Sequence, residues 1–249
     1  HISIIGTGIY LGEGGSKALI GKVDGTKDGS SGQPFRINFN NATISGTSPV
    51  INGDFSAGLN NWSSVTAEVN LGENLPGTSI ATPNDADVTY PSQTPGNDDD
   101  DLISGGDNWE VNDIRGRLRL QERSMTVQPY GVVHGPAAYS DRFYTYANYT
   151  LKFDWEANKV NDDFHVTSYL VDDSNNISIA LDATGTTGSG VGTVTVPNTD
   201  NYRFVFISGT FDKTGGRAAG ASMYIDNIRV EDAMIVDSVI ETIIEQIGR

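Results

Sequence analysis

The sequence predicts an all-β protein built as a β-sandwich, and three observations support this. Short runs rich in Val, Ile, Phe and Tyr recur along the 249 residues, and segments rich in Asn, Asp, Ser, Thr and Gly separate them. Within the runs, large apolar residues alternate with smaller or polar ones, as in Leu151-Lys152-Phe153-Asp154-Trp155. The 29 glycines and 9 prolines supply turns. These features favour two packed sheets over helical bundles or alternating helix–strand folds.

The central part of the chain, residues 48–231, is the expected sandwich, because strand-like segments recur there with turn signals between them. The expected strands lie at 117–121, 149–155, 165–171, 178–181, 192–196, 202–208 and 221–230. Residues 72–108 are poor in apolar side chains and contain the run Asp98-Asp99-Asp100-Asp101. We expect a long surface excursion there rather than regular structure.

Residues 1–47 are predicted to form an N-terminal β extension with strand-like runs at 1–5, 18–23 and 35–39. The first run either belongs to the main body or pairs with the edge of another copy by strand addition, and both alternatives remain open. Residues 232–249 carry apolar side chains at helical spacing with acidic residues between them, which predicts a C-terminal amphipathic helix. Its apolar stripe needs cover from the sandwich or from a neighbouring subunit.

Composition excludes several classes of function. The formal charge of −16 repels phosphate backbones and anionic headgroups, so we expect no nucleic-acid partner. The acidity is explained either by a solvated surface or by bound divalent cations. The absence of cysteine excludes disulfides, zinc–thiolate sites and thiol catalysis. No run of about 18 apolar residues predicts a membrane span. The chain starts at His1 without an initiator Met, which suggests a secreted, processed product or a piece of a longer chain.

Two segments near the ends of the expected sandwich carry a recognisable pattern. The first, from Asn52 to Trp62, reads Asn-Gly-Asp-Phe-Ser-Ala-Gly-Leu-Asn-Asn-Trp and combines tight turns with two aromatic anchors. The second, from Ala221 to Val230, reads Ala-Ser-Met-Tyr-Ile-Asp-Asn-Ile-Arg-Val and predicts a final strand.

Together these segments resemble the opening and closing strands of carbohydrate-binding-module jelly rolls of the glucan- and xylan-binding type. The resemblance covers about 180 residues and implies a jelly-roll sandwich. It also implies a structural Ca²⁺ site joining the first and last strands, with Asp54, Asp226 and Asn52 as ligands. The pattern has Glu after its Phe, whereas this chain has Ser56, which removes one hard oxygen ligand.

A second, less specific likeness involves the stretches 133–140 and 202–212. They are similar to segments of large surface and appendage proteins of marine bacteria and their phages. This likeness implies an extracellular assembly, with adhesion or architecture as its task.

Catalytic signatures are missing from the sequence: there is no nucleophile elbow, no phosphate-binding loop, no zinc-protease motif and no dinucleotide fingerprint. Two histidines are internal. His165 is expected in mid-strand, packed or facing solvent, and His134 lies in a Gly–Pro segment with no evident triad partner. The 32 acidic residues do not exclude a glycosidase pair, but none has a special context. We therefore expect no enzymatic activity.

Sugar binding needs exposed aromatic side chains that stack on pyranose rings. The candidates for such a site are Trp109, Tyr130, Tyr139, Tyr144 and Tyr146. In Tyr144-Thr145-Tyr146 the alternation of a strand places both tyrosine rings on one side.

The sequence thus favours a non-catalytic extracellular structural or adhesive subunit of a surface assembly, such as a filament, surface layer or appendage. Self-association would use the two terminal segments. The alternative is a carbohydrate-binding module that recognises a polysaccharide.

Overall fold

The computed structural model describes residues 49–90, 109–123, 125–127, 130–213 and 220–230, together with the backbone of several further strands. The chain falls into two compact units, His1–Gly46 and Thr47–Arg249. The predicted C-terminal helix at 232–249 and the acidic run at 98–101 lie outside the described residues. In the part that the structure describes, no helix is long and apolar enough to cross a membrane.

The first unit contains an antiparallel sheet with the strand order β1-β2-β3-β4. Its strands are β1 (Ile2–Ile5), β2 (Gly8–Glu13), β3 (Ser16–Val23) and β4 (Ile37–Asn38). The strand β2 was not predicted, because Gly8 and Gly12 flank the short apolar run Ile9-Tyr10-Leu11 and are typical of turns. Pairing of Ile4 with Ile9 shows that β1 joins its own neighbour in the sequence.

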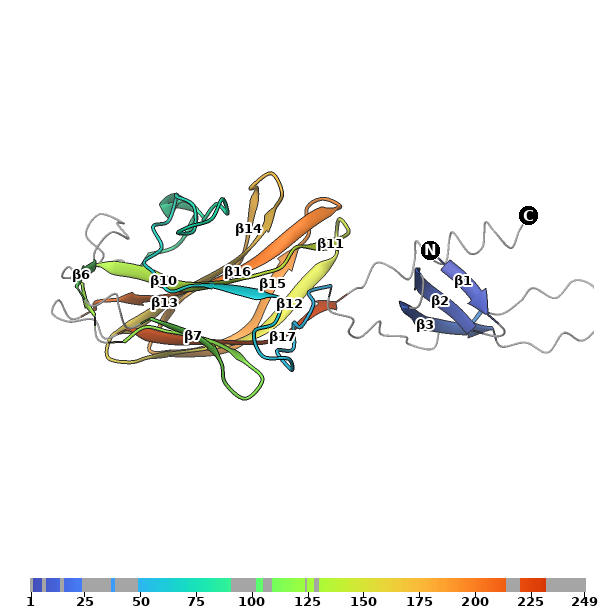
Figure 1. Ribbon diagram of the computed structural model, residues 1–249, viewed down its shortest axis with the longest axis horizontal. Helices are drawn as coiled ribbons and strands as arrows, with labels where there is room; N and C mark the ends of the chain where they lie inside the picture. Colours follow the sequence, from blue (N-terminus) through green and yellow to red (C-terminus); the bar gives the residue numbers. More distant parts are fainter. Residues whose placement is uncertain are drawn as a thin grey trace, which may run out of the picture. The chain divides into compact units, whose positions relative to one another are not determined.

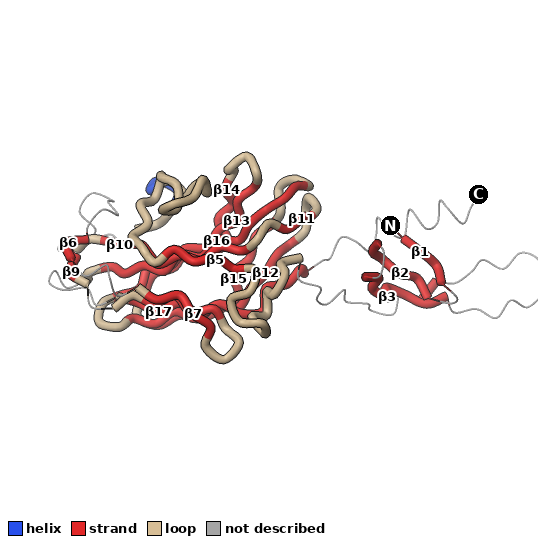
Figure 2. Tube along the Cα trace, viewed as in Figure 1, coloured by secondary structure: helices blue, strands red, loops and turns tan. Residues whose placement is uncertain are grey.

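The second unit is a sandwich of two antiparallel sheets, whose strands are drawn as arrows in Figure 1 and in red in Figure 2. Sheet I has the order β14-β13-β16-β10-β5, with β11 paired to β16. Its strands are β5 (Trp62–Val65), β10 (Val132–Ser140), β11 (Phe143–Thr145), β13 (Asp163–Asp172), β14 (Ile177–Gly185) and β16 (Asp200–Phe211).

Sheet II has the order β15-β12-β17-β8-β7. Its strands are β7 (Glu110–Asp113), β8 (Leu118–Gln121), β12 (Thr150–Lys159), β15 (Thr187–Thr195) and β17 (Ala221–Glu231). A small separate ladder joins β6 (Leu102–Ser104) to β9 (Thr126–Val127). The all-β prediction is confirmed, and every strand expected in the sandwich is present.

The strand β10 was not predicted from the sequence, and its composition explains why. Its sequence, Val132-Val133-His134-Gly135-Pro136-Ala137-Ala138-Tyr139-Ser140, contains a Gly–Pro pair that usually ends a strand. Here the pairing with β16 shifts register between His134 and Ala137, and the strand continues beyond the shift. A β-irregularity accommodates Pro136, which has no backbone N–H to donate.

The main core lies between the two sheets and is rich in aromatic rings. Phe153 from sheet II meets Phe206 of sheet I edge to face, with ring centroids 5.0 Å apart. Trp62, from the first sequence pattern, packs against Phe55 at 5.1 Å and against Phe206 at 5.7 Å. These contacts bury the aromatic anchors that the sequence predicted.

The segment 66–90, which we call the strap, packs on the outer face of sheet I. Five of its apolar side chains are buried there: Val69, Leu71, Leu75, Ile80 and Val88. Burial of each such side chain stabilises the fold by about 1.5–3 kcal/mol. The strap has little regular structure beyond the short 3₁₀ helix η1 (Asp85–Asp87), as expected. The expectation of a surface excursion from residue 72 is wrong for residues 72–90, because they form a second hydrophobic core with the sheet.

The strap explains the burial pattern of β16. For this strand, alternation predicts one buried face and a second face that is wet or covered by a partner, and Phe204, Val205 and Phe206 are all 0% exposed. Phe204 and Phe206 belong to the core between the sheets, whereas Val205 belongs to the core under the strap. Sheet I is therefore covered on both faces.

Candidate ligand-binding face

The outer face of sheet II, in contrast, is open and polar. Along β12 the inward residues Leu151, Phe153 and Ala157 are fully buried, and Lys152 and Asp154 on the other side are partly exposed. The same alternation continues across the neighbouring strands. The face is formed by Glu110, Asn112, Arg117, Arg119, Gln121, Lys152, Asp154, Glu156, Ser222, Tyr224, Asp226 and Arg229, with Arg123 at its rim.

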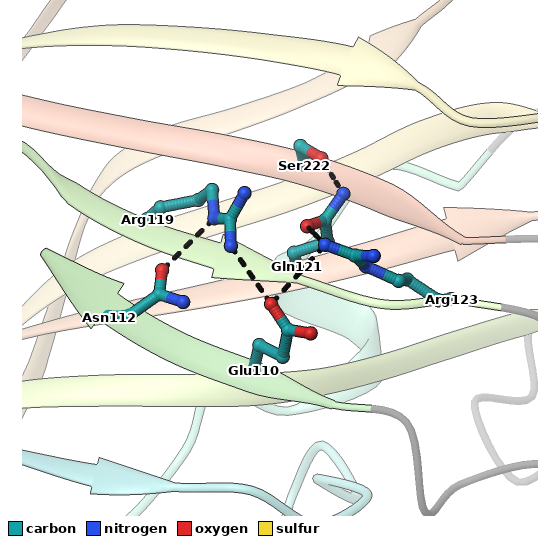
Figure 3. Close-up of polar contacts among 6 residues, drawn as sticks. All are labelled: Glu110, Asn112, Arg119, Gln121, Arg123 and Ser222. Carbon is teal, nitrogen blue, oxygen red and sulfur yellow. Dashed lines mark hydrogen bonds and ion pairs between the residues drawn. The ribbon is translucent and has the colours of Figure 1, made fainter. Parts of the chain in front are cut away.

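One part of this polar face is a network that spans β7, β8 and β17 (Figure 3). The Arg119 guanidinium donates Nε–H to Asn112 Oδ1 over 3.0 Å and Nη2–H to Glu110 Oε2 over 2.8 Å. Arg123 reaches the same carboxylate oxygen at 3.4 Å. Gln121 accepts a hydrogen bond from Arg123 and donates one to Ser222 Oγ, at 2.8 and 2.9 Å. The two guanidinium groups, the Glu110 carboxylate and the Gln121 amide each have two partners that hold their orientation.

A second part of the face lies around Tyr224. The Arg117 guanidinium is 4.6 Å from the centroid of this ring and donates to Glu156 Oε2 over 2.9 Å. This bond to Arg117 is the main reason why the pKa of Glu156 is lowered. Glu156 Oε1 also accepts from Asn158 over 2.9 Å. Cation–π contact and ion pairing thus fix the guanidinium above the ring.

The third part contains the strand pair β12 and β17. Asp154 accepts hydrogen bonds from Arg229 at 2.8 Å and from Asn227 at 2.9 Å. Asp226 faces Asp154 in the ladder. Partial burial is the main reason why the pKa of Asp226 is raised, and the negative charges of Asp154 and Asp54 raise it further.

Charges on this face nearly balance. Five basic residues (Arg117, Arg119, Arg123, Lys152 and Arg229) stand against four acidic ones (Glu110, Asp154, Glu156 and Asp226), whereas the whole chain has 16 against 32. Half-exposed guanidinium, carboxylate and amide groups in fixed positions donate and accept hydrogen bonds in the way that hydroxyl-rich ligands require.

The structure brings the two sequence patterns together, as the resemblance implied. The backbone N–H of Ile228 donates to the carbonyl oxygen of Gly53 over 2.9 Å. The Asn52 amide, however, is used inside its own turn, where it donates to Gly58 and Asn60 and accepts from Ala57.

The predicted calcium ligands are only partly assembled. Asp54 Oδ1 accepts from the Ser56 hydroxyl at 2.9 Å, and hydrogen bonds to Ser56 are the main reason why the pKa of Asp54 is lowered. Within the described ranges no group of three or more His, Asp or Glu side chains could hold a metal ion. An ion between Asp54 and Asp226 would therefore also need backbone carbonyl oxygens.

Two of the predicted aromatic candidates form an exposed pair. Tyr144 and Tyr146 are 55% and 52% exposed, and their rings meet edge to face with centroids 5.4 Å apart. Tyr146 also packs against Tyr149 at 5.3 Å, and Tyr149 packs against the core. Thr145 between them is buried, so both rings lie on one side as predicted.

The other three aromatic candidates lie apart from the Tyr144–Tyr146 pair. Trp109 is 6% exposed and packs with Met125, so its ring offers no open face for stacking. Tyr139 packs beside the strap core, with the Arg203 guanidinium 5.7 Å from its centroid. Tyr130 is 41% exposed on a turn.

The structure also assembles a buried cluster that the sequence did not predict. His134 Nε2 lies 2.7 Å from His165 Nδ1, and both side chains are 0% exposed. His165 Nε2 lies 3.2 Å from Asp182 Oδ1, and Asp182 Oδ2 accepts from the backbone N–H of Thr89 over 2.7 Å. The two histidines come from β10 and β13, which flank β16, and meet beside Gly209 of that strand. No signal in one sequence reveals this pairing.

A second buried titratable group is Glu122, directly after β8. Its carboxyl group is fully buried, and among the described residues neither of its oxygens has a hydrogen-bond partner within 3.5 Å. Burial raises the pKa of Glu122 well above its ordinary value, an effect that the nearby Ser208 hydroxyl partly offsets. Glu122 is therefore a neutral acid inside the fold.

Comparison with family models and with curated proteins found no match. Among solved structures, the chain is similar to a family 4 carbohydrate-binding module (CBM4), with 13% identity and a TM-score of 0.36 over 71% of this chain and 97% of that one. It is also similar to the K3 adhesin domain of Lys-gingipain from Porphyromonas gingivalis, with 12% identity and a TM-score of 0.35 over 72% and 95% of the two chains. A third similar structure is the enzymatically active domain of bacteriophage CBA120 tailspike protein 4, with 13% identity and a TM-score of 0.33 over 74% of this chain and 21% of that one.

Proposed function

We propose that this chain is a non-catalytic extracellular adhesive module that binds a polysaccharide through the outer face of sheet II. One observation carries the proposal: of the two outer sheet faces, one is apolar and covered by the strap, and the other is polar and open. A sheet that needs no further cover can stay exposed for a ligand.

The chemistry of the open face supports a hydroxyl-rich ligand. Its guanidinium, amide and carboxylate groups are already oriented by one another, so little conformational entropy is lost when a ligand takes up their remaining lone pairs and N–H groups. Tyr224 adds an aromatic surface in the middle of these groups, beside Arg117.

Glycan binding by the purified chain tests the proposal. An array of plant and marine polysaccharides, screened with calcium present, should identify a ligand, and titration calorimetry should give its affinity. We expect Arg119→Ala to weaken binding about 10- to 100-fold, because charge-assisted hydrogen bonds are worth roughly 1.5–3 kcal/mol.

Arg142→Ala is the matched control. Arg142, like Arg119, has a carboxylate partner, Asp173 at 2.9 Å, but it lies in the turn after β10 of sheet I. This variant should bind like the wild type. Silence of the wild type across the array, or equal binding by the Arg119→Ala variant, would refute the proposal.

A second candidate function is that of a self-associating structural subunit. The supporting observation is that β1, with Ile2, Ile4 and Ile5, lies at the edge of the four-stranded sheet. An apolar edge strand can extend its sheet into another copy. Light scattering should then show assemblies of the full chain and monomers after deletion of residues 1–10. Normal assembly without these residues would count against this function, and deletion of 234–249 tests the other terminal segment.

A further inference from the structure

The buried histidine pair lies beneath the last residues of the strap. The Tyr90 ring is 5.3 Å from the His165 ring and 6.2 Å from the His134 ring, measured between centroids. One hydrogen bond ties the strap to the pair and a second ties it to the neighbouring Asp182: Val69 N–H donates to the His134 carbonyl oxygen over 2.9 Å, and Thr89 N–H donates to Asp182. The strap and the histidine cluster are thus one packed unit.

The contact between the two rings can hold only one proton. At 2.7 Å, one of His134 Nε2 and His165 Nδ1 must donate and the other must accept. If both imidazoles were protonated, two N–H groups would face each other and two positive charges would share one dry site. The His134 ring already fills the space that a side chain at Gly209 would occupy, so it has no room to shift further toward β16.

Titratable groups from β14, the strap and β13 lie beside the pair. Asp182 from β14 faces His165, with Oδ1 3.2 Å from His165 Nε2. The strap contributes Tyr90, whose hydroxyl donates to Asp85 over 3.0 Å. From β13, Tyr169 lies on the same side of the sheet, in the core under the strap. The neighbour on β16 is Gly209, which carries no charge.

We propose that acid releases the strap from the outer face of sheet I. When the strap opens and the two rings separate, the histidine pair takes up the proton that the closed His134–His165 contact excludes. Opening exposes the apolar outer face of sheet I. Because exposed imidazole titrates near neutral pH, the transition falls in a range that extracellular surroundings reach.

The direction of the effect follows from proton linkage. Burial is the main cause that holds the pKa of His134 well below its ordinary value, and the charge of His165 acts in the same sense. Below pH 6.5, the ordinary pKa of histidine, the closed state therefore binds fewer protons than the open state. Above that pH the strap keeps its full stability. Below it, each pH unit increases the equilibrium constant for strap opening up to tenfold. At pH 5 the increase is roughly thirtyfold.

Hydrogen exchange of the whole chain, followed by mass spectrometry of its peptides, tests the proposal. After correction for intrinsic exchange, protection of the strap (66–90) should fall roughly thirtyfold between pH 7.5 and pH 5, with the strands β12 and β17 as internal reference. The variant His134→Gln keeps a polar group at the contact and cannot take up the proton. Its strap should lose less than about threefold in protection over the same range.

His1→Gln is the matched control, since His1 is the third histidine of the chain and lies outside the sandwich unit. It should respond like the wild type. A strap that keeps its protection at pH 5, or that loses it equally in His134→Gln, would overturn the proposal. If His134→Gln fails to fold, an NMR titration of the wild-type imidazoles decides: two rings that both become protonated while the strap stays protected would refute it.

Discussion

The Phe153 ring occupies the space beside Gly192 that a Cβ atom would need, so the two residues form a complementary pair across β12 and β15. Phe153 is fully buried between the sheets and meets the rings of Phe204 and Phe206. The absence of a side chain at Gly192 therefore lets sheet II hold a large aromatic residue in the core.

Substitution of Gly192 should consequently destabilise the sandwich. We expect Gly192→Ala to lower the free energy of unfolding by roughly 1–3 kcal/mol, because the added methyl group must displace a ring that has no free space. Urea denaturation measures the change. Val191→Ala, at an adjacent position that is 50% exposed, is the control and should change stability by less than about 0.5 kcal/mol. Equal effects of the two substitutions would contradict this packing argument.

Glu122 should make stability fall as the pH rises. Its pKa is raised in the fold, so the unfolded chain loses this proton near the ordinary value of 4.5 while the folded chain retains it. The resulting loss of stability begins above pH 4.5 and grows until the folded carboxyl itself ionises. Glu122→Gln should remove this dependence and stabilise the protein at pH 8 by about 1 kcal/mol or more. Melting curves from pH 5 to pH 9 provide the measurement, and a variant with the same pH dependence as the wild type would exclude a neutral buried acid.

The Tyr144–Tyr146 pair remains a predicted stacking site for a sugar ring. Because both rings are about half exposed, Tyr144→Ala and Tyr146→Ala should leave the melting temperature nearly unchanged. The pair lies at β11 of sheet I, so it would form a site separate from the face of sheet II, and a glycan bound at this second site should lose affinity about three- to tenfold in each variant through loss of aromatic contact. Calorimetry with the ligand found on the array measures the affinity of each variant. Tyr130→Ala is the control and should bind like the wild type. Unchanged affinity in both variants would assign the pair to ordinary surface.

Calcium at the junction of the first and last strands also remains a prediction. A cation would relieve the repulsion that Asp154 and Asp54 exert on Asp226, so calcium should raise the melting temperature and a chelator should lower it. Asp226→Asn should abolish the difference, whereas Asp87→Asn in the strap should preserve it. An identical melting temperature with and without chelator would argue against a structural ion.

The sequence by itself determined the local structure of this protein. Alternating apolar residues predicted β8 and the strands from β12 to β17, and the patterns around Phe55 and Asp226 indicated a sandwich whose first and last strands meet. These signals are local, because period-two alternation and turn residues act within a few positions of one another. Strands interrupted by glycine or proline, such as β2 and β10, were not predicted, because the interruption breaks this local pattern.

Only the tertiary structure decided which faces are covered and which side chains meet. Alternation shows that a strand has two faces, but whether the second face is wet depends on a distant segment such as the strap. His134 and His165 are 31 positions apart and meet because β16 lies between their strands and carries Gly209 at that point. The open polar face of sheet II likewise requires five strands to be placed in order. Such contacts depend on strand order and register across the whole chain, and no local pattern encodes them.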